Sequence, residues 1–346
     1  DPRILDNTGL NARLAEFNEA ARSLAQARGL IFVDLFTALK DAPQPLTRDG
    51  MHFTAKGSQV VGEAIAQALG SPAQVAPALR TAIVEKNRLW FDTWRCMNWA
   101  FAYGDRTTQP FAKSSAERPS FVDELKKHLP RLEHAEATIL ALARGEKAPA
   151  PLPPAPPRAD PAALSPDEEK ANFKLRAGFD VSLFADEKLG VVRPVQIRWD
   201  ERGRLWVACI PSYPQLQPGE HGHDYILILE DTNGDGKADK ALRFAEGLTM
   251  PMGFEFAPAE VGGGIYVLES TQLVHLPDRN HDDRADSRAV LLSGFGTGDT
   301  HQNANSLRWG PDGSLWFTQG YHIWSYVETP HGLAELNRSG VWRFNP

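Results

Sequence analysis

The chain has 346 residues, more than a single small domain needs and enough for two or three domains. Hydrophobic residues make up 42% and charged residues 23% of it, so an ordinary globular core is expected. The net charge of −7 argues against a nucleic-acid-binding surface. No apolar run approaches the roughly 20 residues of a transmembrane helix, and two distant cysteines indicate no disulfide framework.

The first seventy residues have the pattern of an α/β unit. Apolar side chains recur on one helical face over residues 10–28, and Gly29 is a typical helix-ending residue. The apolar run LIFVDLF (30–36) is typical of a buried strand, and a second amphipathic helix begins after Thr54. Helix, buried strand, loop and helix are the order found in parallel α/β sheets, so we expect residues 1–70 to be part of one.

The loop LTRDGMHFTAKG (46–57) places an aspartate three residues before a histidine. Asp49 can reach back to Nδ1 of His52, which fixes the imidazole tautomer and leaves Nε2 to take a proton from a nucleophile. Two ordinary loop residues are the alternative. The stretch resembles the last sequence block of the SGNH (GDSL-type) hydrolases, which implies that Asp49 orients His52 as the general base. The serine and oxyanion residues of that family belong to earlier blocks, so this fragment alone is expected to be inactive.

The middle of the chain contains a helical segment and a linker. Residues 71–145 show helical periodicity, interrupted by the irregular, aromatic-rich stretch 96–113, which we expect to pack the helices together. Many prolines and almost no large apolar residues follow, so residues 146–171 are predicted to be an extended spacer between domains.

Residues 172–346 have a repeated β pattern. The stretches 196–208, 253–269 and 306–319 each consist of a short apolar strand, a turn containing glycine, and a strand with an aromatic residue. They recur about every fifty residues, a period expected of propeller blades. A second repeat, DTNGDGKAD (231–239) and DRNHDDRAD (278–286), interleaves with the first. We therefore expect an all-β, partial propeller.

The second repeat has the oxygen-rich composition of calcium-binding loops. Calcium takes six to eight oxygen ligands, which carboxylate and amide side chains on a tight loop can supply. The candidate ligands are Asp231, Asn233, Asp235 and Asp239 in the first loop and Asp278, Asn280, Asp282 and Asp286 in the second. Neither loop has the glutamate of an EF-hand, and plain hairpin turns are the alternative.

The stretch GDTHQNANSLRWGPDGSLWF (298–317) places His301 just before a predicted strand, where the ligands of propellers gather. A histidine ahead of LxxGPDG is similar to that of the soluble quinoprotein glucose and sorbosone dehydrogenases. The resemblance implies that His301 takes the proton of a substrate hydroxyl while hydride passes to pyrroloquinoline quinone (PQQ). The alternative is a rim histidine that is hydrogen-bonded to a neighbouring blade.

Over about residues 173–346 the chain also resembles the propeller of the membrane-bound dehydrogenases of planctomycetes and verrucomicrobia, through LEDTNGDGKAD and the run from Ser306 to the end. Some of these proteins carry an SGNH-type unit ahead of the propeller. The expected fold is therefore multidomain. It comprises part of an SGNH-type α/β domain (1–70), a helical appendage (71–145), a Pro-rich linker (146–171) and a partial β-propeller (172–346).

These resemblances imply a fragment of a bifunctional enzyme in the periplasm or outside the cell. An SGNH-type ester hydrolase would be joined to a glucose/sorbosone dehydrogenase-like propeller with calcium and PQQ as cofactors. Its partners would be a carbohydrate or acylated glycan substrate and, in the full-length protein, a cytochrome c electron acceptor. The alternative is a propeller that binds sugar or protein without catalysis, beside a degenerate hydrolase remnant.

Overall fold

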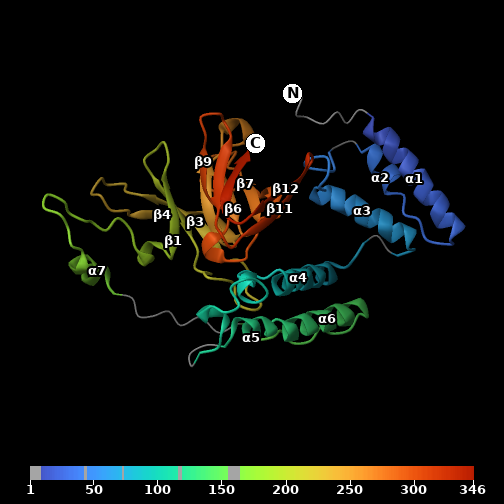
Figure 1. The fold of residues 1–346 in the computed structure, drawn as a ribbon, viewed down its shortest axis with the longest axis horizontal. Coiled ribbons are helices and arrows are strands. Elements are labelled where there is room, and N and C mark those ends of the chain that lie inside the picture. Colours follow the sequence, from blue (N-terminus) through green and yellow to red (C-terminus); the bar gives the residue numbers. More distant parts are fainter. Residues whose placement is uncertain (1–8, 43–44, 72–73, 116–118, 155–163) are drawn as a thin grey trace. The chain divides into compact units, whose positions relative to one another are not determined.

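The computed structural model describes residues 9–42, 45–71, 74–115, 119–154 and 164–346. The contacts divide the chain into two units, which are described separately. The first comprises residues 1–85, 139–148 and 328–334, and the second comprises residues 86–138, 149–327 and 335–346. Figure 1 shows helices in the blue-to-green part of the chain and strands in the yellow-to-red part. The described chain is thus a helical N-terminal segment followed by a β-rich region.

The first unit begins with three helices, α1 (Leu10–Ala27), α2 (Leu35–Lys40) and α3 (Ala55–Ala68). The predicted end of α1 is confirmed, because Gly29 has a φ of +64° and Leu30 N–H donates to the Ala25 carbonyl at 2.9 Å. Thr54 caps α3 as predicted, accepting a hydrogen bond from Gly57 N–H at 3.1 Å.

The prediction of a strand at residues 30–36 is wrong, because the structure has none there. Leu30 and Ile31 are 62% and 66% exposed, and Asp34 accepts a hydrogen bond from Thr37 N–H at 3.0 Å to cap α2. A buried strand needs neighbours along both edges, whereas the β pairing described before α4 is the isolated bridge Thr47–Phe53. The described part of residues 1–70 is therefore helical, without the sheet of an α/β domain.

The middle of the chain is helical, as predicted. It contains α4 (Pro77–Trp94), α5 (Phe121–Lys126) and α6 (Leu129–Ala143), with the short 3-10 turns η1 (Trp99–Phe101) and η2 (Pro110–Ala112) between α4 and α5. Phe101, Phe111 and Phe121 pack edge-to-face or tilted, with ring centroids 4.8–6.4 Å apart. The predicted linker contains a short helix, α7 (Pro166–Asn172), begun by a Ser165–Glu168 capping box. Residues 155–163 of the linker lie outside the described residues.

The β-rich region is a series of antiparallel sheets. The first contains β1 (Pro194–Trp199), β2 (Leu205–Cys209), β3 (Asp224–Glu230) and β4 (Lys240–Leu248), and the second contains β5 (Pro251–Phe256), β6 (Ile265–Glu269), β7 (Gln272–Leu276) and β8 (Ala289–Ser293). In both sheets the strands lie side by side in chain order. The third contains β9 (Asn305–Trp309), β10 (Leu315–Gln319) and β13 (Gly340–Phe344), in the order β13-β10-β9. A separate hairpin joins β11 (Trp324–Thr329) and β12 (Gly332–Asn337).

The three repeated strand–turn–strand stretches are hairpins, as their pattern predicts. They form the pairs β1–β2, β5–β6 and β9–β10. Apolar residues of the first two sheets share one core, in which Ile226, Phe254 and Val267 have no exposed surface. The sheets are therefore fixed by buried apolar surface, and the loops at the strand ends can carry polar groups. None of the helices in the described part of the chain is long and apolar enough to cross a bilayer.

Candidate functional site

His301 lies in the short 3-10 turn η5 (Thr300–Gln302), directly before β9, as predicted. The turn is capped by Asp299, whose Oδ1 accepts a hydrogen bond from the His301 backbone N–H at 3.0 Å. The same oxygen lies 3.0 Å from His301 Nδ1. Since a carboxylate only accepts, the proton of the imidazole is held on Nδ1, and Nε2 is left as the basic nitrogen.

Tyr213 occupies the other side of the imidazole. This residue lies in the loop between β2 and β3, and its hydroxyl donates to His301 Nε2. The two rings are perpendicular, with centroids 5.1 Å apart. Arg193 supports this loop, because its Nη1 donates to the carbonyls of Pro211 and Tyr213 at 2.8 and 2.7 Å. A side chain from the β2–β3 loop of the first sheet thus contacts His301. This contact is compatible with both predicted roles, a base for a substrate hydroxyl and a rim histidine bonded to a neighbouring blade.

Arg106 comes to the site from the helical segment, between η1 and η2, and forms an ion pair with Asp299. Asp299 has no exposed surface, so Arg106 supplies the counter-charge that its burial requires. Partial burial and the Arg106 charge both lower the pKa of His301. The imidazole is therefore neutral at neutral pH and can accept a proton.

Asn98 fastens the same helical segment to the loop that carries His301. Its Nδ2 donates to the Pro214 carbonyl at 3.0 Å and to Gln215 Oε1 at 2.9 Å, while its Oδ1 accepts from Thr300 N–H at 2.9 Å. Asn98 is 1% exposed and has a φ of +59°, a left-handed conformation that asparagine adopts more readily than most residues. The helical segment is therefore an integral wall of the site.

These groups border a cavity of about 410 Å³. Its volume falls within the roughly 300–1,000 Å³ of small-molecule sites. Phe101, Phe111 and Pro110 supply apolar surface, while His301, Tyr213 and Arg106 supply polar groups. The sequence pattern identified His301, but not Arg106 or Asn98, which lie about 200 residues earlier. The spacing Asp299-x-His301 was the available signal for the orienting carboxylate.

The first predicted calcium loop joins β3 to β4 and is stabilised by its own side chains. Asp231 accepts hydrogen bonds from Gly234 N–H at 2.7 Å and Gly236 N–H at 2.8 Å, and Asn233 accepts one from Asp235 N–H at 2.9 Å. Asp239 accepts from the Thr232 hydroxyl at 2.8 Å. The backbone donors, that of Gly236 foremost, lower the pKa of Asp231. The loop is thus an ordered, anionic turn.

The second loop joins β7 to β8 and repeats this arrangement. Asp278 accepts from Asp282 N–H and Asp283 N–H, both at 3.1 Å, and Asp286 accepts from Arg279 N–H at 2.7 Å. Asn280 Nδ2 donates to Asp282 at 3.1 Å. Among the described residues no group of three or more His, Cys, Asp and Glu side chains is placed to hold a metal ion. Calcium binding at either loop stays a prediction.

Asp283, at the position where the first loop has Gly236, is bound by a guanidinium group. Arg204 donates to its two carboxylate oxygens at 2.7 and 2.8 Å and to Asp200 at 2.9 Å. Arg204 is 7% exposed, so this pairing joins the β1–β2 turn to the second loop in a partly buried environment. The carboxylate of Asp283 in the second loop is therefore paired with Arg204.

The other predicted pair lies in the first unit. Asp49 Oδ2 is 2.7 Å from His52 Nδ1, as the three-residue spacing predicts, and Asp49 Oδ1 accepts from His52 N–H at 2.7 Å. Partial burial raises the pKa of Asp49, but the hydrogen bonds together lower it more, so the pKa lies below its usual value. The catalytic role of the two residues stays a prediction.

A search of the curated proteins finds no match to this chain. Residues 165–346 match a protein family described as a domain of unknown function, DUF7133. The match covers the β-rich region with His301 and both acidic loops, and it begins after the helical segment that supplies Asn98 and Arg106. Because it spans more than half of the sequence, the chain belongs to the DUF7133 family.

Proposed function

We propose that the β-rich region is a partial propeller that binds a polyhydroxylated substrate in the cavity beside His301 and removes the proton of a substrate hydroxyl. The observation that carries the proposal is the Asp299–His301 pair, with Nδ1 held at 3.0 Å by a buried carboxylate. A substrate hydroxyl would take the place of the Tyr213 hydroxyl at Nε2. The O–H proton would pass to Nε2, and the imidazolium formed would be stabilised by Asp299.

Oxidation of the substrate also needs a hydride acceptor. The resemblance to quinoprotein dehydrogenases names PQQ, which as a bound quinone would take up the hydride. Its carboxylates require cationic partners, and among the described residues lining this cavity the cation is Arg106, already paired with Asp299. The residues of this cavity therefore do not fit PQQ by themselves, and we derive no step through it.

Dye-linked oxidation of aldoses by the full-length parent protein tests this proposal. PQQ and calcium are added, and residues outside this cavity would have to hold the quinone. We expect His301→Gln to lower the rate by about 10²–10⁴, the usual contribution of a general base. His331→Gln, in the exposed turn between β11 and β12, should keep the wild-type rate. Aldose binding by calorimetry without any dye reduction in the wild type would instead favour the non-catalytic binding platform.

A second function is favoured by the geometry of Asp49 and His52. We propose that this pair is the base and orienting acid of an SGNH-type ester hydrolase, whose nucleophile and oxyanion residues belong to another part of the parent protein. The supporting observation is the 2.7 Å separation of Asp49 Oδ2 and His52 Nδ1. Acylated glycans in the periplasm or outside the cell are the substrates and the location that the resemblance suggests.

Hydrolysis of p-nitrophenyl acetate by the parent protein tests this second function. His52→Ala should abolish turnover, and Asp49→Asn should reduce it by about 10⁴ because the imidazole would be held in the wrong tautomer. The His331→Gln variant serves again as a control. Turnover that survived in His52→Ala would remove the proposed base without bearing on the His301 site.

A further inference from the structure

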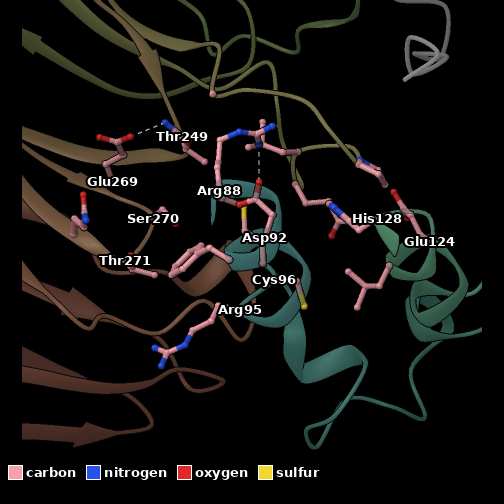
Figure 2. A pocket seen from close by; sticks show the side chains of 18 of the residues that line it. Arg88, Asp92, Arg95, Cys96, Glu124, His128, Thr249, Glu269, Ser270 and Thr271 are labelled. Carbon is pink, nitrogen blue, oxygen red and sulfur yellow. Dashed lines mark hydrogen bonds and ion pairs between the residues drawn. The ribbon is translucent and has the colours of Figure 1, made fainter. Parts of the chain in front are cut away.

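A second cavity, of about 340 Å³, lies between the helical segment and the β-rich region within the second unit. It shares no lining residue with the cavity beside His301. Figure 2 shows Arg88 and Asp92 from α4, with Thr249 and the turn between β6 and β7 (Ser270 and Thr271) on one side of them. Cys96, two residues after the end of α4, also lines the cavity. His128 and Glu124 form another part of the wall.

The charged residues of this cavity differ in how far they are already paired. Arg88 donates to Asp92 and to the Glu220 carbonyl, both at 2.7 Å, which balances its charge. Arg288 lies 3.0 Å from Glu269 and donates to Gln272 at 3.0 Å. Arg95 is exposed and has no ion pair among the described residues. Within the described part of the chain, the cavity therefore offers one guanidinium without an ion pair, Arg95, and a second, Arg288, whose charge is balanced by one carboxylate.

Glu269 is an unusual partner for Arg288 because it is only 3% exposed. Its Oε1 accepts a hydrogen bond from Thr249 N–H at 2.9 Å. Burial, opposed by Arg288 and reinforced by the nearby carboxylate of Asp224, raises the pKa of Glu269 to about 7. Protonation of Glu269 would leave the charge of Arg288 without its carboxylate partner.

His128 adds a polar group without adding charge. It is 5% exposed, and its Nδ1 has no hydrogen-bond partner among the described residues. Burial, followed by the charges of Arg88 and Arg131, lowers its pKa to about 4. Since buried polar atoms are normally paired, this ring nitrogen indicates a missing partner.

We propose that this cavity binds a small polyhydroxylated carboxylate, such as a sugar acid, with its carboxylate on Arg95 and Arg288. The hydroxyls would bond to the wall groups Thr249, Ser270, Thr271, Gln215 and His128. Phe91, which is 44% exposed, presents an apolar ring to the C–H face of such a ligand. The proposal does not depend on any reaction at His301.

Proton uptake should accompany binding. A ligand carboxylate on Arg288 would compete with ionised Glu269 for that charge and so favour the protonated form of Glu269. The carboxylate of Asp224 also raises the pKa of Glu269, and the charge of Arg88 is neutralised by Asp92. The other charged residues that line the cavity are Glu124 and Arg95. The affinity for the sugar acid should therefore be constant below about pH 7. Above that pH it should decrease, by up to tenfold for each pH unit.

Calorimetric titration of the whole chain with D-gluconate, D-glucuronate, D-glucose and acetate, at pH 6, 7 and 8, tests the proposal. The two sugar acids should bind, with proton uptake visible in buffers of different ionisation enthalpy. Arg95→Gln should weaken binding about tenfold, because a charge-assisted contact is lost. Glu269→Gln should keep the binding and remove its pH dependence, and His301→Gln should bind like the wild type.

Arg279→Gln is the matched control for charge, because Arg279 is exposed and lies outside the cavity. This variant should bind the sugar acids as the wild type does. Absence of heat with both sugar acids would overturn the proposal, as would equal weakening in Arg95→Gln and Arg279→Gln. Glucose or acetate that bound as tightly as gluconate and was weakened by Arg95→Gln would overturn the ligand class. Glucose bound in the cavity beside His301 would not respond to Arg95→Gln, because Arg95 does not line that cavity.

Discussion

Two aspartate–histidine pairs of similar geometry occur in this chain in very different surroundings. Asp49 and His52 both lie in a loop, with side chains 21% and 24% exposed. Asp299 is fully buried and needs Arg106 as its counter-ion, while its His301 partner is 65% exposed. Both aspartates have an arginine beside them, Arg48 at 3.8 Å from Asp49 and Arg106 at Asp299, so the burial of the carboxylate is what distinguishes the two pairs.

Replacing Arg106 should raise the pKa of His301. Arg106 lowers the pKa of His301 through its own charge and also neutralises Asp299. In Arg106→Gln the Asp299 carboxylate would therefore stabilise the imidazolium without a nearby positive charge to offset it. We expect the pKa of His301, followed by the NMR shift of its Hε1, to be higher in the variant than in the wild type. Arg338→Gln, which removes a partner of Asp105 instead, should leave it unchanged. A midpoint that stayed constant or fell in Arg106→Gln would contradict the assigned ion pair.

The proximity of Asp49 and His52 was predicted, because their three-residue spacing encodes it. The proximity of Asp299 and His301 was not predicted, although their two-residue spacing is an equally local signal. The contacts of Arg106 and Asn98 could not be predicted, since they join residues about 200 positions apart. The aromatic-rich stretch 96–113 showed only that the segment is irregular and buried. Its polar residues make the specific contacts, and a single sequence contains no periodicity that reports them.

At the scale of elements, patterns that depend on neighbours in the chain were predicted correctly. The amphipathic helices α1 and α3 and the three repeated hairpins follow from side-chain period and turn residues. The prediction of a strand at residues 30–36 was wrong because a short apolar segment does not distinguish a strand from other structures. Asp34 favours a helix start at this position, since its side chain caps α2 and also accepts a hydrogen bond from Asn18 at 3.0 Å.

Two glycines of α3 should respond in opposite ways to alanine. A Cβ on Gly57 would overlap the Leu46 carbonyl oxygen, whereas a Cβ on Gly62 would meet nothing within 4 Å. Gly57→Ala should therefore destabilise the contact between α3 and the Asp49–His52 loop by about 1–3 kcal/mol. Gly62→Ala should stabilise the helix by about 0.5–1 kcal/mol. Urea denaturation followed by circular dichroism measures both; equal effects would mean that α3 does not approach Leu46 this closely.

At the scale of the whole molecule, the family match and the structural unit have different boundaries. The match begins at residue 165, whereas the second unit also includes residues 86–138. Backbone bonds join the two parts, with Asn98 N–H donating to the Thr297 carbonyl at 2.8 Å and Ala100 N–H to the Gly298 carbonyl at 3.1 Å. The helical segment therefore completes the β-rich region, and both candidate cavities of this unit lie where the two parts meet.

Asn98 is the residue at which this dependence can be measured. Asn98→Ala would remove the acceptor of Thr300 N–H and strain a backbone at φ +59°, at a cost of about 2–4 kcal/mol. Asn98→Gly keeps that backbone conformation without strain, so its smaller loss isolates the side-chain hydrogen bonds. Hydrogen exchange of the Thr300 amide should accelerate in both variants, while the amide of Val267, in the core of the second sheet, should respond only to the change in global stability. If Thr300 remained as protected as in the wild type, the helical segment would not hold the His301 loop, and the site would belong to the β-rich region alone.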